Sequence, residues 1–162
     1  MNKLFILILI TFFSLEAKAQ CEYSKELVDP FTQYVILETP SMSLGKKYPE
    51  IKLNRVVDEN GETKSFTFLF DPEGYLCLTP ESYVLINYEN NTQTRHNYLG
   101  DKQCTMDLMT GKFKIEEADV KKMKKSPISA VRIYVEGTYK DYMQIVRYKY
   151  FQNYLECIED ED

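Results

Sequence analysis

The chain has 162 residues, a formal net charge of −5 and a sequence pI near 5.1. This acidic balance argues against a nucleic-acid-binding protein, because such proteins need clustered cations that replace counterions. The 13 tyrosines and 9 phenylalanines, without tryptophan, favour β-strands, whose pleated, half-buried surfaces suit aromatic side chains.

The first 19 residues have the pattern of a secretory signal peptide. Lys3 supplies a positive charge, residues 4–13 are apolar except for Thr11, and Ala17-Lys18-Ala19 has the small-x-small pattern that signal peptidase accepts. We therefore expect cleavage after Ala19 and export to the periplasm or the cell exterior. A membrane anchor is the alternative, but the apolar run falls short of the roughly 20 residues that a spanning helix needs. The mature chain is expected to have no transmembrane segment.

Cys21 raises a further alternative, a lipoprotein anchored through this residue. The lipidation signal prefers a small residue directly before the cysteine and an aliphatic residue three positions before it. Gln20 and Lys18 occupy those positions here. The sequence therefore favours a single β-rich domain over residues 20–162, without a lipid anchor and with an acidic tail at 159–162.

The four cysteines are Cys21, Cys77, Cys104 and Cys157. In an oxidising compartment an even number predicts two disulfides. A zinc site is the competing interpretation, but no C-x-x-C is present and His96 is the single histidine. Spacing does not choose among the three pairings that four cysteines allow. We expect Cys21–Cys77 with Cys104–Cys157, which would link the N-terminal segment and the last helix to the sheet, and we expect no metal or other cofactor.

The mature chain predicts short antiparallel strands and two helices, with loops at 41–50 and 100–111. Strands are expected at 34–38, 51–58, 63–70, around Cys77, and at 83–89, 93–99, 128–135 and 138–146, with helices at 116–125 and 150–158. The predicted fold class is mainly β (β-rich α+β). It is an antiparallel sandwich or strongly bent sheet of about seven to eight strands, with one short helix and a C-terminal amphipathic helix.

Asn60-Gly61 predicts a type I′ hairpin turn, since both residues tolerate the positive φ that this turn requires. A two-residue turn at these residues is expected to pair Leu53 with Phe68, Ile51 with Phe70 and Arg55 with Phe66. One face of the hairpin is then apolar and the other mostly polar, which is typical of an antiparallel sheet with one solvated side.

The two predicted helices carry different patterns. Helix 116–125 begins with acidic residues and ends with lysines, as the helix dipole favours, and Val120 and Met123 would be its buried side. Its lysines could form an anion- or lipid-binding patch, but the adjacent acidic residues favour a solvated helix face. The C-terminal helix has an apolar stripe at i, i+3, i+4 and i+7. That stripe consists of Phe151, Tyr154, Leu155 and Ile158.

Strands 128–135 and 138–146 are expected to pair about Glu136-Gly137. A two-residue turn at this point is expected to place Arg132 opposite Asp141, Tyr134 opposite Tyr139 and Ile128 opposite Ile145. An arginine–aspartate pair could belong to an active site. Cross-strand ion pairs are common in sheets, however, so we interpret Arg132 and Asp141 as a structural pair.

The predicted strand 93–99 is largely polar and is expected to lie at a sheet edge. Its candidate binding surface consists of Gln93, Arg95, His96 and Tyr98. A histidine on a polar strand beside turns is expected to be exposed. We therefore place any function on this strand and its flanking loops.

The sequence offers no catalytic residues. Ser-His-Asp and Cys-His sites would both depend on His96, and no Gly-rich phosphate loop is present. The favoured function is a non-enzymatic binding or structural module of the bacterial envelope, whose partner is another protein, a peptide or a glycan. One alternative is an inhibitor or immunity protein that captures a basic partner with its acidic tail. Another is a hydrolase that uses paired carboxylates.

The last fifty residues contain four short motifs that together carry a resemblance to other proteins. The motifs that carry the likeness are Phe113-x-Ile115, Asp119-Val120-x-x-Met123, Pro127-Ile128-x-x-Val131-Arg132-Ile133-Tyr134 and Cys157-Ile158. In this respect the chain resembles small exported proteins of Gram-negative bacteria. The resemblance implies an exported, β-rich domain and no particular activity, so it assigns no functional residues.

Overall fold

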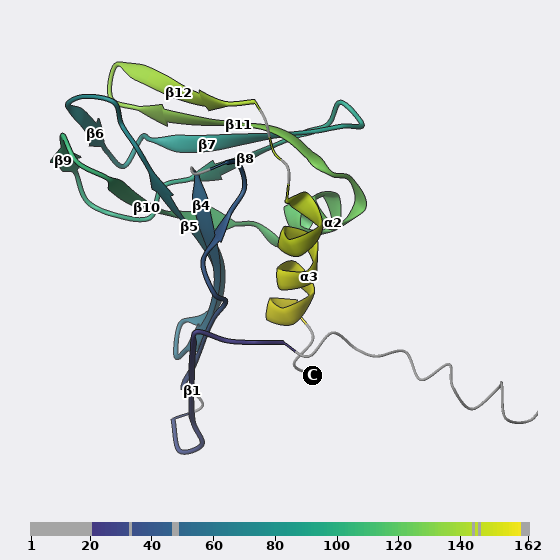
Figure 1. The fold of residues 1–162 in the computed structure, drawn as a ribbon. Helices are drawn as coiled ribbons and strands as arrows, with labels where there is room; N and C mark the ends of the chain where they lie inside the picture. Colours follow the sequence, from purple (N-terminus) through teal and green to yellow (C-terminus); the bar gives the residue numbers. More distant parts are fainter. Residues whose placement is uncertain (1–20, 33, 47–48, 144, 146, 160–162) are drawn as a thin grey trace, which may run out of the picture.

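The computed structural model describes residues 21–32, 34–46, 49–143, 145 and 147–159. The expected signal peptide at 1–19 and residues 160–162 of the acidic tail lie outside the described residues. The described chain is mainly β, with antiparallel strands and a helical C-terminus, which confirms the predicted fold class (Figure 1). It contains twelve strands instead of about seven or eight, because strands also form at 25–29, 42–43, 103–105 and 109–115, and the last three lie wholly or partly in segments that were expected to be loops.

The strands and helices follow one another in a simple order along the chain. They are β1 (Lys25–Asp29), β2 (Tyr34–Glu38), β3 (Met42–Ser43), β4 (Glu50–Asp58), β5 (Gly61–Phe70), β6 (Leu76–Leu78), β7 (Tyr83–Tyr88), β8 (Gln93–Asn97), β9 (Gln103–Thr105), β10 (Met109–Ile115), α2 (Glu117–Lys125), β11 (Ile128–Val135), β12 (Thr138–Tyr142) and α3 (Tyr148–Glu159).

The first sheet has six strands, in the order β1-β2-β4-β5-β10, with β3 paired to β4. Its longest hairpin, β4–β5, pairs Ile51 with Phe68, Leu53 with Phe66 and Arg55 with Lys64. The predicted register of this hairpin was wrong by two residues. A shift of two keeps every side chain on its predicted face, so the apolar face is as expected.

The register differs because the β4–β5 turn has a different centre. Asp58 pairs with Gly61, which places Glu59 and Asn60 in the turn. Gly61 has a φ of 109°, whereas Asn60 is not among the described non-glycine residues with positive φ. A type I′ turn requires positive φ at both central residues and so does not form at Asn60-Gly61. The Asp58 carboxylate instead accepts the Asn60 N–H at 2.8 Å.

The second sheet has the strand order β12-β11-β7-β8. Pairing of β11 with β12 confirms the predicted Arg132–Asp141 and Tyr134–Tyr139 registers. Two details were wrong: β12 ends at Tyr142, and Ile128 pairs with Tyr88 of β7 instead of with Ile145. Residue 146, the predicted end of this strand, lies outside the described residues. Strand β8 ends the order, which confirms it as an edge strand of this sheet.

The two sheets meet where β8 runs on towards β10, so the β structure bends around a common core (Figure 1). Tyr98 forms an isolated bridge with Phe113, and the Leu99 N–H donates to the Lys112 carbonyl at 2.7 Å. Both sheets and α3 contribute fully buried side chains to this core. They include Leu53, Phe66 and Phe68 of the first sheet, Val84, Ile86 and Ile133 of the second, and Phe151, Leu155 and Ile158 of α3.

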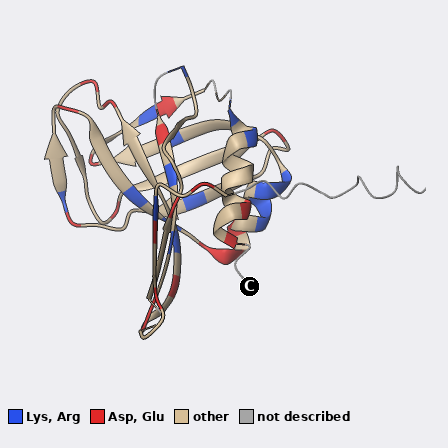
Figure 2. Ribbon diagram, turned by 60° about the horizontal axis from the view of Figure 1, so that its bottom comes forward, with Lys and Arg blue, Asp and Glu red and all other residues tan. Residues whose placement is uncertain are grey.

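Helix α2 has the predicted polarity, and α3 buries Phe151, Leu155 and Ile158 of its predicted stripe, while Tyr154 is half-buried. Val120 and Met123 are the buried residues of α2. Lysines of its last turn are seen as blue ribbon beside α3 in Figure 2, and Lys124 pairs with Glu159 of α3 at 2.5 Å. Neither helix among the described residues is long and apolar enough to cross a membrane.

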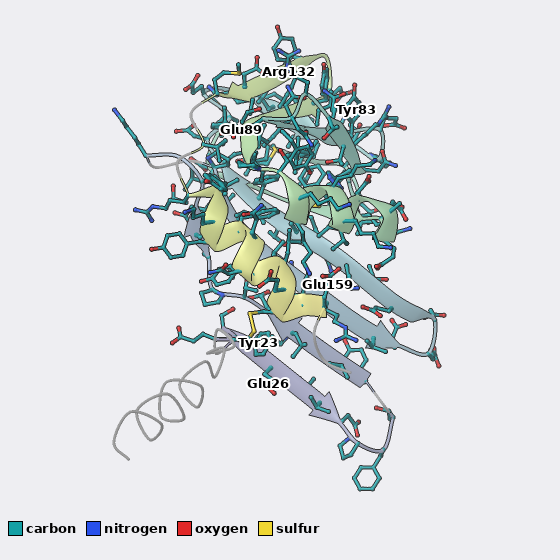
Figure 3. All side chains as sticks on the ribbon, turned by 90° about the vertical axis from the view of Figure 1, so that its right-hand side faces the viewer. Tyr23, Glu26, Tyr83, Glu89, Arg132 and Glu159 are labelled. Atoms are coloured by element: carbon teal, nitrogen blue, oxygen red, sulfur yellow. A yellow bond between two sulfur atoms is a disulfide. The ribbon has the colours of Figure 1, made fainter. Side chains whose placement is uncertain are left out.

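Two disulfides are present, but the predicted pairing was wrong. Cys77 is bonded to Cys104, and Cys21 is bonded to Cys157, with Cα–Cα distances of 4.0 and 5.5 Å. The reason lies in segment 100–111, which was expected to be a loop. It contains β9, which pairs with β6 and places Cys104 directly opposite Cys77. The remaining disulfide joins the N-terminal segment to α3 instead of joining either to the sheet, as Figure 3 shows near Tyr23.

Candidate binding face

The outer face of the four-stranded sheet displays a set of aromatic and charged side chains. Alternation along each strand produces this face: in β7, Val84 and Ile86 are buried, whereas Tyr83 and Leu85 are half-buried. Strand β8 alternates in the same way, as does β11 from Val131 onward, whereas β12 is exposed or half-buried along its whole length. The outward residues relevant to binding are Tyr83, Arg95, Arg132, Tyr134, Tyr139 and Asp141.

Five of these side chains form a continuous row across the four strands, which we name the Arg–Tyr row. It consists of Arg95, Tyr83, Tyr134, Tyr139 and Arg132. The Arg95 guanidinium lies 3.7 Å from the Tyr83 ring centroid, and Tyr83 stacks on Tyr134 with centroids 4.4 Å apart at 19°. The Tyr134 and Tyr139 centroids are 5.7 Å apart, and the Arg132 guanidinium lies 4.1 Å from the Tyr139 centroid. Each ring is therefore held by a neighbour before any ligand arrives.

Arg132 of β11 is the last member of the row, and it forms an ion pair with two hydrogen bonds to Asp141 of β12. Its Nε and Nη2 donate to the two carboxylate oxygens of Asp141 at 2.5 and 2.7 Å. Donation from Arg132 lowers the pKa of Asp141 below its ordinary value, and the carboxylate in turn raises the pKa of the guanidinium. This planar, bidentate geometry orients Arg132 more firmly than a lysine could be oriented.

A shallow hollow of about 150 Å³ adjoins the Arg–Tyr row. Its apolar lining includes Leu85, Ala130 and Met143, while Asn87 and Gln93 are the polar side chains at the β7–β8 side. Arg132 and Asp141 border it as well. A cavity of about this volume accepts a benzene-sized group. The hollow is therefore large enough for one apolar side chain.

The structure separates the four residues that the sequence placed on one binding surface. Gln93 and Arg95 lie on the outer face and are exposed. His96 is 0% exposed, so the prediction of an exposed histidine was wrong. Tyr98 is half-buried and packs against Phe113, with centroids 5.7 Å apart. The prediction failed because strand alternation sends His96 and Tyr98 to the opposite face from Arg95.

His96 belongs to a buried hydrogen-bonded chain between the two sheets. Its Nδ1 lies 2.9 Å from the Lys114 carbonyl, its Nε2 lies 2.8 Å from the Thr94 hydroxyl, and that hydroxyl lies 2.9 Å from the Tyr88 hydroxyl. Because a carbonyl only accepts, Nδ1 donates to Lys114, which leaves Nε2 to accept from Thr94 and Thr94 to accept from Tyr88. Burial lowers the pKa of His96, in keeping with a neutral ring.

Three acidic side chains at a second hollow are engaged in ion pairs. This hollow is lined by Glu62, Glu116 and Glu117 together with Lys64 and Lys114. Lys64 pairs with Glu62 and Glu117 at 3.3 and 3.2 Å, and Lys114 pairs with Glu116 at 2.9 Å. Among the described residues, no group of three or more His, Cys, Asp or Glu side chains is placed to hold a metal ion.

Comparison with known proteins finds no match to this chain among family models, curated proteins or solved structures. The choice of this face as the candidate site is therefore supported by its geometry alone. Tyr83 was not predicted as part of this face, although the predicted β11–β12 register already paired Tyr134 with Tyr139. The missing information was the non-local pairing of β7 with β11, which places Tyr83 beside Tyr134.

Proposed function

We propose that this chain is an exported, disulfide-stabilised binding module, and that it binds another protein through the outer face of its four-stranded sheet. The observation that carries the proposal is the Arg–Tyr row. Tyrosine and arginine are enriched at protein–protein interfaces, where they dominate the binding energy. The module acts by binding, without catalysis.

The row favours a protein partner over a glycan. Sugars bind aromatic platforms by lying on open ring faces, but Tyr83 is flanked on both sides. Strands β8 and β11 lie on either side of β7, so Arg95 and Tyr134 approach the Tyr83 ring from opposite sides. Rings that are stacked on one another direct their edges and polar groups outward. Such side chains suit hydrogen bonding and edge contacts with a polypeptide.

Pre-organisation of the row adds to the case for binding. Ordering a flexible side chain on binding costs roughly 0.5–1.5 kcal/mol. The contacts of Tyr83 with Arg95 and Tyr134, and of Arg132 with Asp141, restrict these side chains in the free protein. The adjoining hollow supplies a place for one apolar anchor of the partner beside the ordered row.

Export is supported by the disulfides as well as by the N-terminal pattern. Both described disulfides are of the kind that persists in the oxidising environment outside the cytoplasm. The sulfur of Cys21 is bonded to Cys157, which leaves it unable to carry a thioether-linked lipid. We therefore propose a periplasmic or extracellular module held by disulfides and not anchored through Cys21.

The test compares three versions of the purified exported chain as bait in an envelope extract. The first is the parent, the second carries Tyr83→Ala and Arg95→Ala, and the third carries Glu117→Ala and Lys121→Ala on α2 as a control. A specific partner is expected to be captured by the parent and the control and lost by the face variant. With the purified partner, the face variant is expected to raise Kd by about tenfold or more.

A further variant separates the hollow from the row. Asn87 is exposed and lines the hollow, so Asn87→Trp fills this space without removing any member of the row. We expect it to weaken the same partner while the fold, followed by circular dichroism, stays that of the parent. Binding that is equal for the parent, the face variant and Asn87→Trp would place the partner on another surface and reject the proposal.

A further inference from the structure

Strand β1 presents an open edge. It ends the strand order of the six-stranded sheet and pairs only with β2 among the described strands. Its residues Lys25, Glu26, Leu27 and Val28 are all exposed. Figure 3 shows β1, marked by Glu26, as the outermost strand of this sheet.

The open edge has apolar side chains on both faces of the strand. Leu27 is 46% exposed and its neighbour Val28 is 54% exposed, and consecutive strand residues point to opposite sides. The β1–β2 ladder runs without a bulge from Lys25–Glu38 to Asp29–Tyr34. Edges are commonly protected by proline, bulges or covering segments. Strand β1 contains no proline or bulge, and its protection consists of charged side chains.

The charges of β1 are self-complementary. The strand reads Lys-Glu-Leu-Val-Asp over residues 25–29. If two copies pair antiparallel about Leu27, each Leu27 lies opposite the other, and Lys25 lies opposite Asp29 at both ends. The two ion pairs and the leucine pair then share one face, since all three positions have the same parity. A foreign strand without this pattern would place unmatched charges opposite Lys25 and Asp29.

Asp29 carries the charge that this pairing needs. Its carboxylate accepts the backbone N–H of Phe31 at 2.9 Å in the turn that follows β1. These turn hydrogen bonds lower its pKa, so the carboxylate remains charged at neutral pH. Phe31 itself is 95% exposed in this turn. Because residues 30–32 form the turn into β2, the proposed pairing is confined to residues 25–29.

We propose that this chain forms a twofold homodimer by antiparallel pairing of β1 with β1 of a second copy, centred on Leu27. The dimer joins the two six-stranded sheets into one continuous sheet and leaves the outer faces of both four-stranded sheets uncovered by the contact. A pair of five-residue strands is a small interface, so the dimer is of the concentration-dependent kind.

A cysteine at the axis tests the register directly. Directly opposed residues of an antiparallel pair have Cα atoms about 4.5–5.5 Å apart, within disulfide range. Mild oxidation of Leu27→Cys is therefore expected to give a covalent dimer on a non-reducing gel. The control is Lys25→Cys on the same face: its two copies lie four residues apart along the strands, roughly 13 Å, and are expected to remain uncross-linked.

Charge reversal tests the ion pairs without any covalent bond. Lys25→Glu places a carboxylate opposite Asp29 at both ends of the interface and is expected to raise the dimer dissociation constant by about tenfold or more. Lys121→Glu makes the same charge change on α2 and is expected to leave it unchanged. Sedimentation equilibrium over a concentration series measures both, and circular dichroism confirms that each variant is folded.

Two results would overturn the proposal. One is a parent chain that stays monomeric up to about 1 mM, which corresponds to less than roughly 4 kcal/mol of association free energy. The other is equal cross-linking of Leu27→Cys and Lys25→Cys, because random collision does not distinguish the two positions. In either case the edge of β1 would be left for a strand from a different protein.

Discussion

The inner and outer faces of the four-stranded sheet treat polar side chains in opposite ways. On the inner face, Tyr88, Thr94 and His96 are buried and each satisfies the next by a hydrogen bond. On the outer face, Arg95, Tyr83 and Tyr134 interact mainly through ring and cation contacts and remain accessible. Both sets include residues of the single strand β8.

Under the proposed function, one polar strand supports the fold with its inner side chains and contacts the partner with its outer ones. Buried polar groups are tolerated only when they are paired, so the inner chain fixes how β8 sits against β10. The polar groups of the outer row need no protein partner, because water can hydrogen-bond to those that are left unpaired. Substitutions on the inner face should therefore affect stability, whereas those on the outer face should affect binding.

The largest difference in stability between the two faces is expected from His96→Ala. The change removes a fully buried ring and leaves the Thr94 hydroxyl and the Lys114 carbonyl short of a partner. We expect a loss of about 3–5 kcal/mol in the free energy of unfolding, measured by urea denaturation. Arg95→Ala on the same strand is the control, with an expected loss of about 0.5–1 kcal/mol. Equal losses would show that the two faces do not differ.

Mild acid should act on the inner face alone. The pKa of His96 is lowered from 6.5, chiefly by burial, although Lys114, Asp119 and Glu116 raise it and Lys122 lowers it further. The unfolded chain then binds a proton before the folded chain does, so stability is full above about pH 6.5 and falls as pH decreases towards the folded pKa. Denaturation midpoints between about pH 7 and pH 5 should show this loss.

The loss of stability between about pH 7 and pH 5 can be assigned to His96, because the carboxylates with shifted pKa values titrate at lower pH. The pKa values of Asp29, Glu81 and Asp141 are lowered from 3.8, 4.5 and 3.8, so their contributions are lost only in stronger acid. His96 is the single histidine of the chain. His96→Gln should therefore remove the slope between about pH 7 and pH 5. A slope that persists in this variant would assign the effect to another group.

The smallest effect on stability is expected at the outer ion pair. The side chains of Arg132 and Asp141 are 39% and 31% exposed. Solvent screening limits such a pair, so a double-mutant cycle of Arg132→Ala and Asp141→Ala should give a coupling of about 0.5–1 kcal/mol. A coupling of about 3 kcal/mol or more would instead identify a buried pair, and the outer face would then contribute to stability as the inner face does.

Local patterns predicted much of the fold. The turn at Glu136-Gly137 placed Arg132 opposite Asp141 correctly, because Gly137, with a φ of 75°, suits a tight turn and the flanking alternation is strong. The stripe of α3 and the buried side of α2 were predicted for similar reasons. The β4–β5 register was missed by two residues, since Asp58 and Gly61 permit another turn that composition does not exclude.

Contacts between distant segments could not be predicted in the same way. Strand β1 was not foreseen, because Lys-Glu-Leu-Val-Asp has no clear alternation and its pairing with β2 is what makes it a strand. Segment 103–105 looked like a loop until paired with β6, and this pairing decides the disulfides. The burial of His96 depends on β10 lying over β8, where Lys114 supplies the acceptor.

The Cys21–Cys157 bond also has a mechanical consequence. It joins residues 136 positions apart, and every described strand lies between them. Tension applied to the segments before Cys21 and after Cys157 passes through the sulfur–sulfur bond and bypasses both sheets. A single peptide cleavage between these cysteines opens the ring but leaves the pieces covalently joined. While this bond is intact, the domain can be pulled by its ends without its strands being peeled apart.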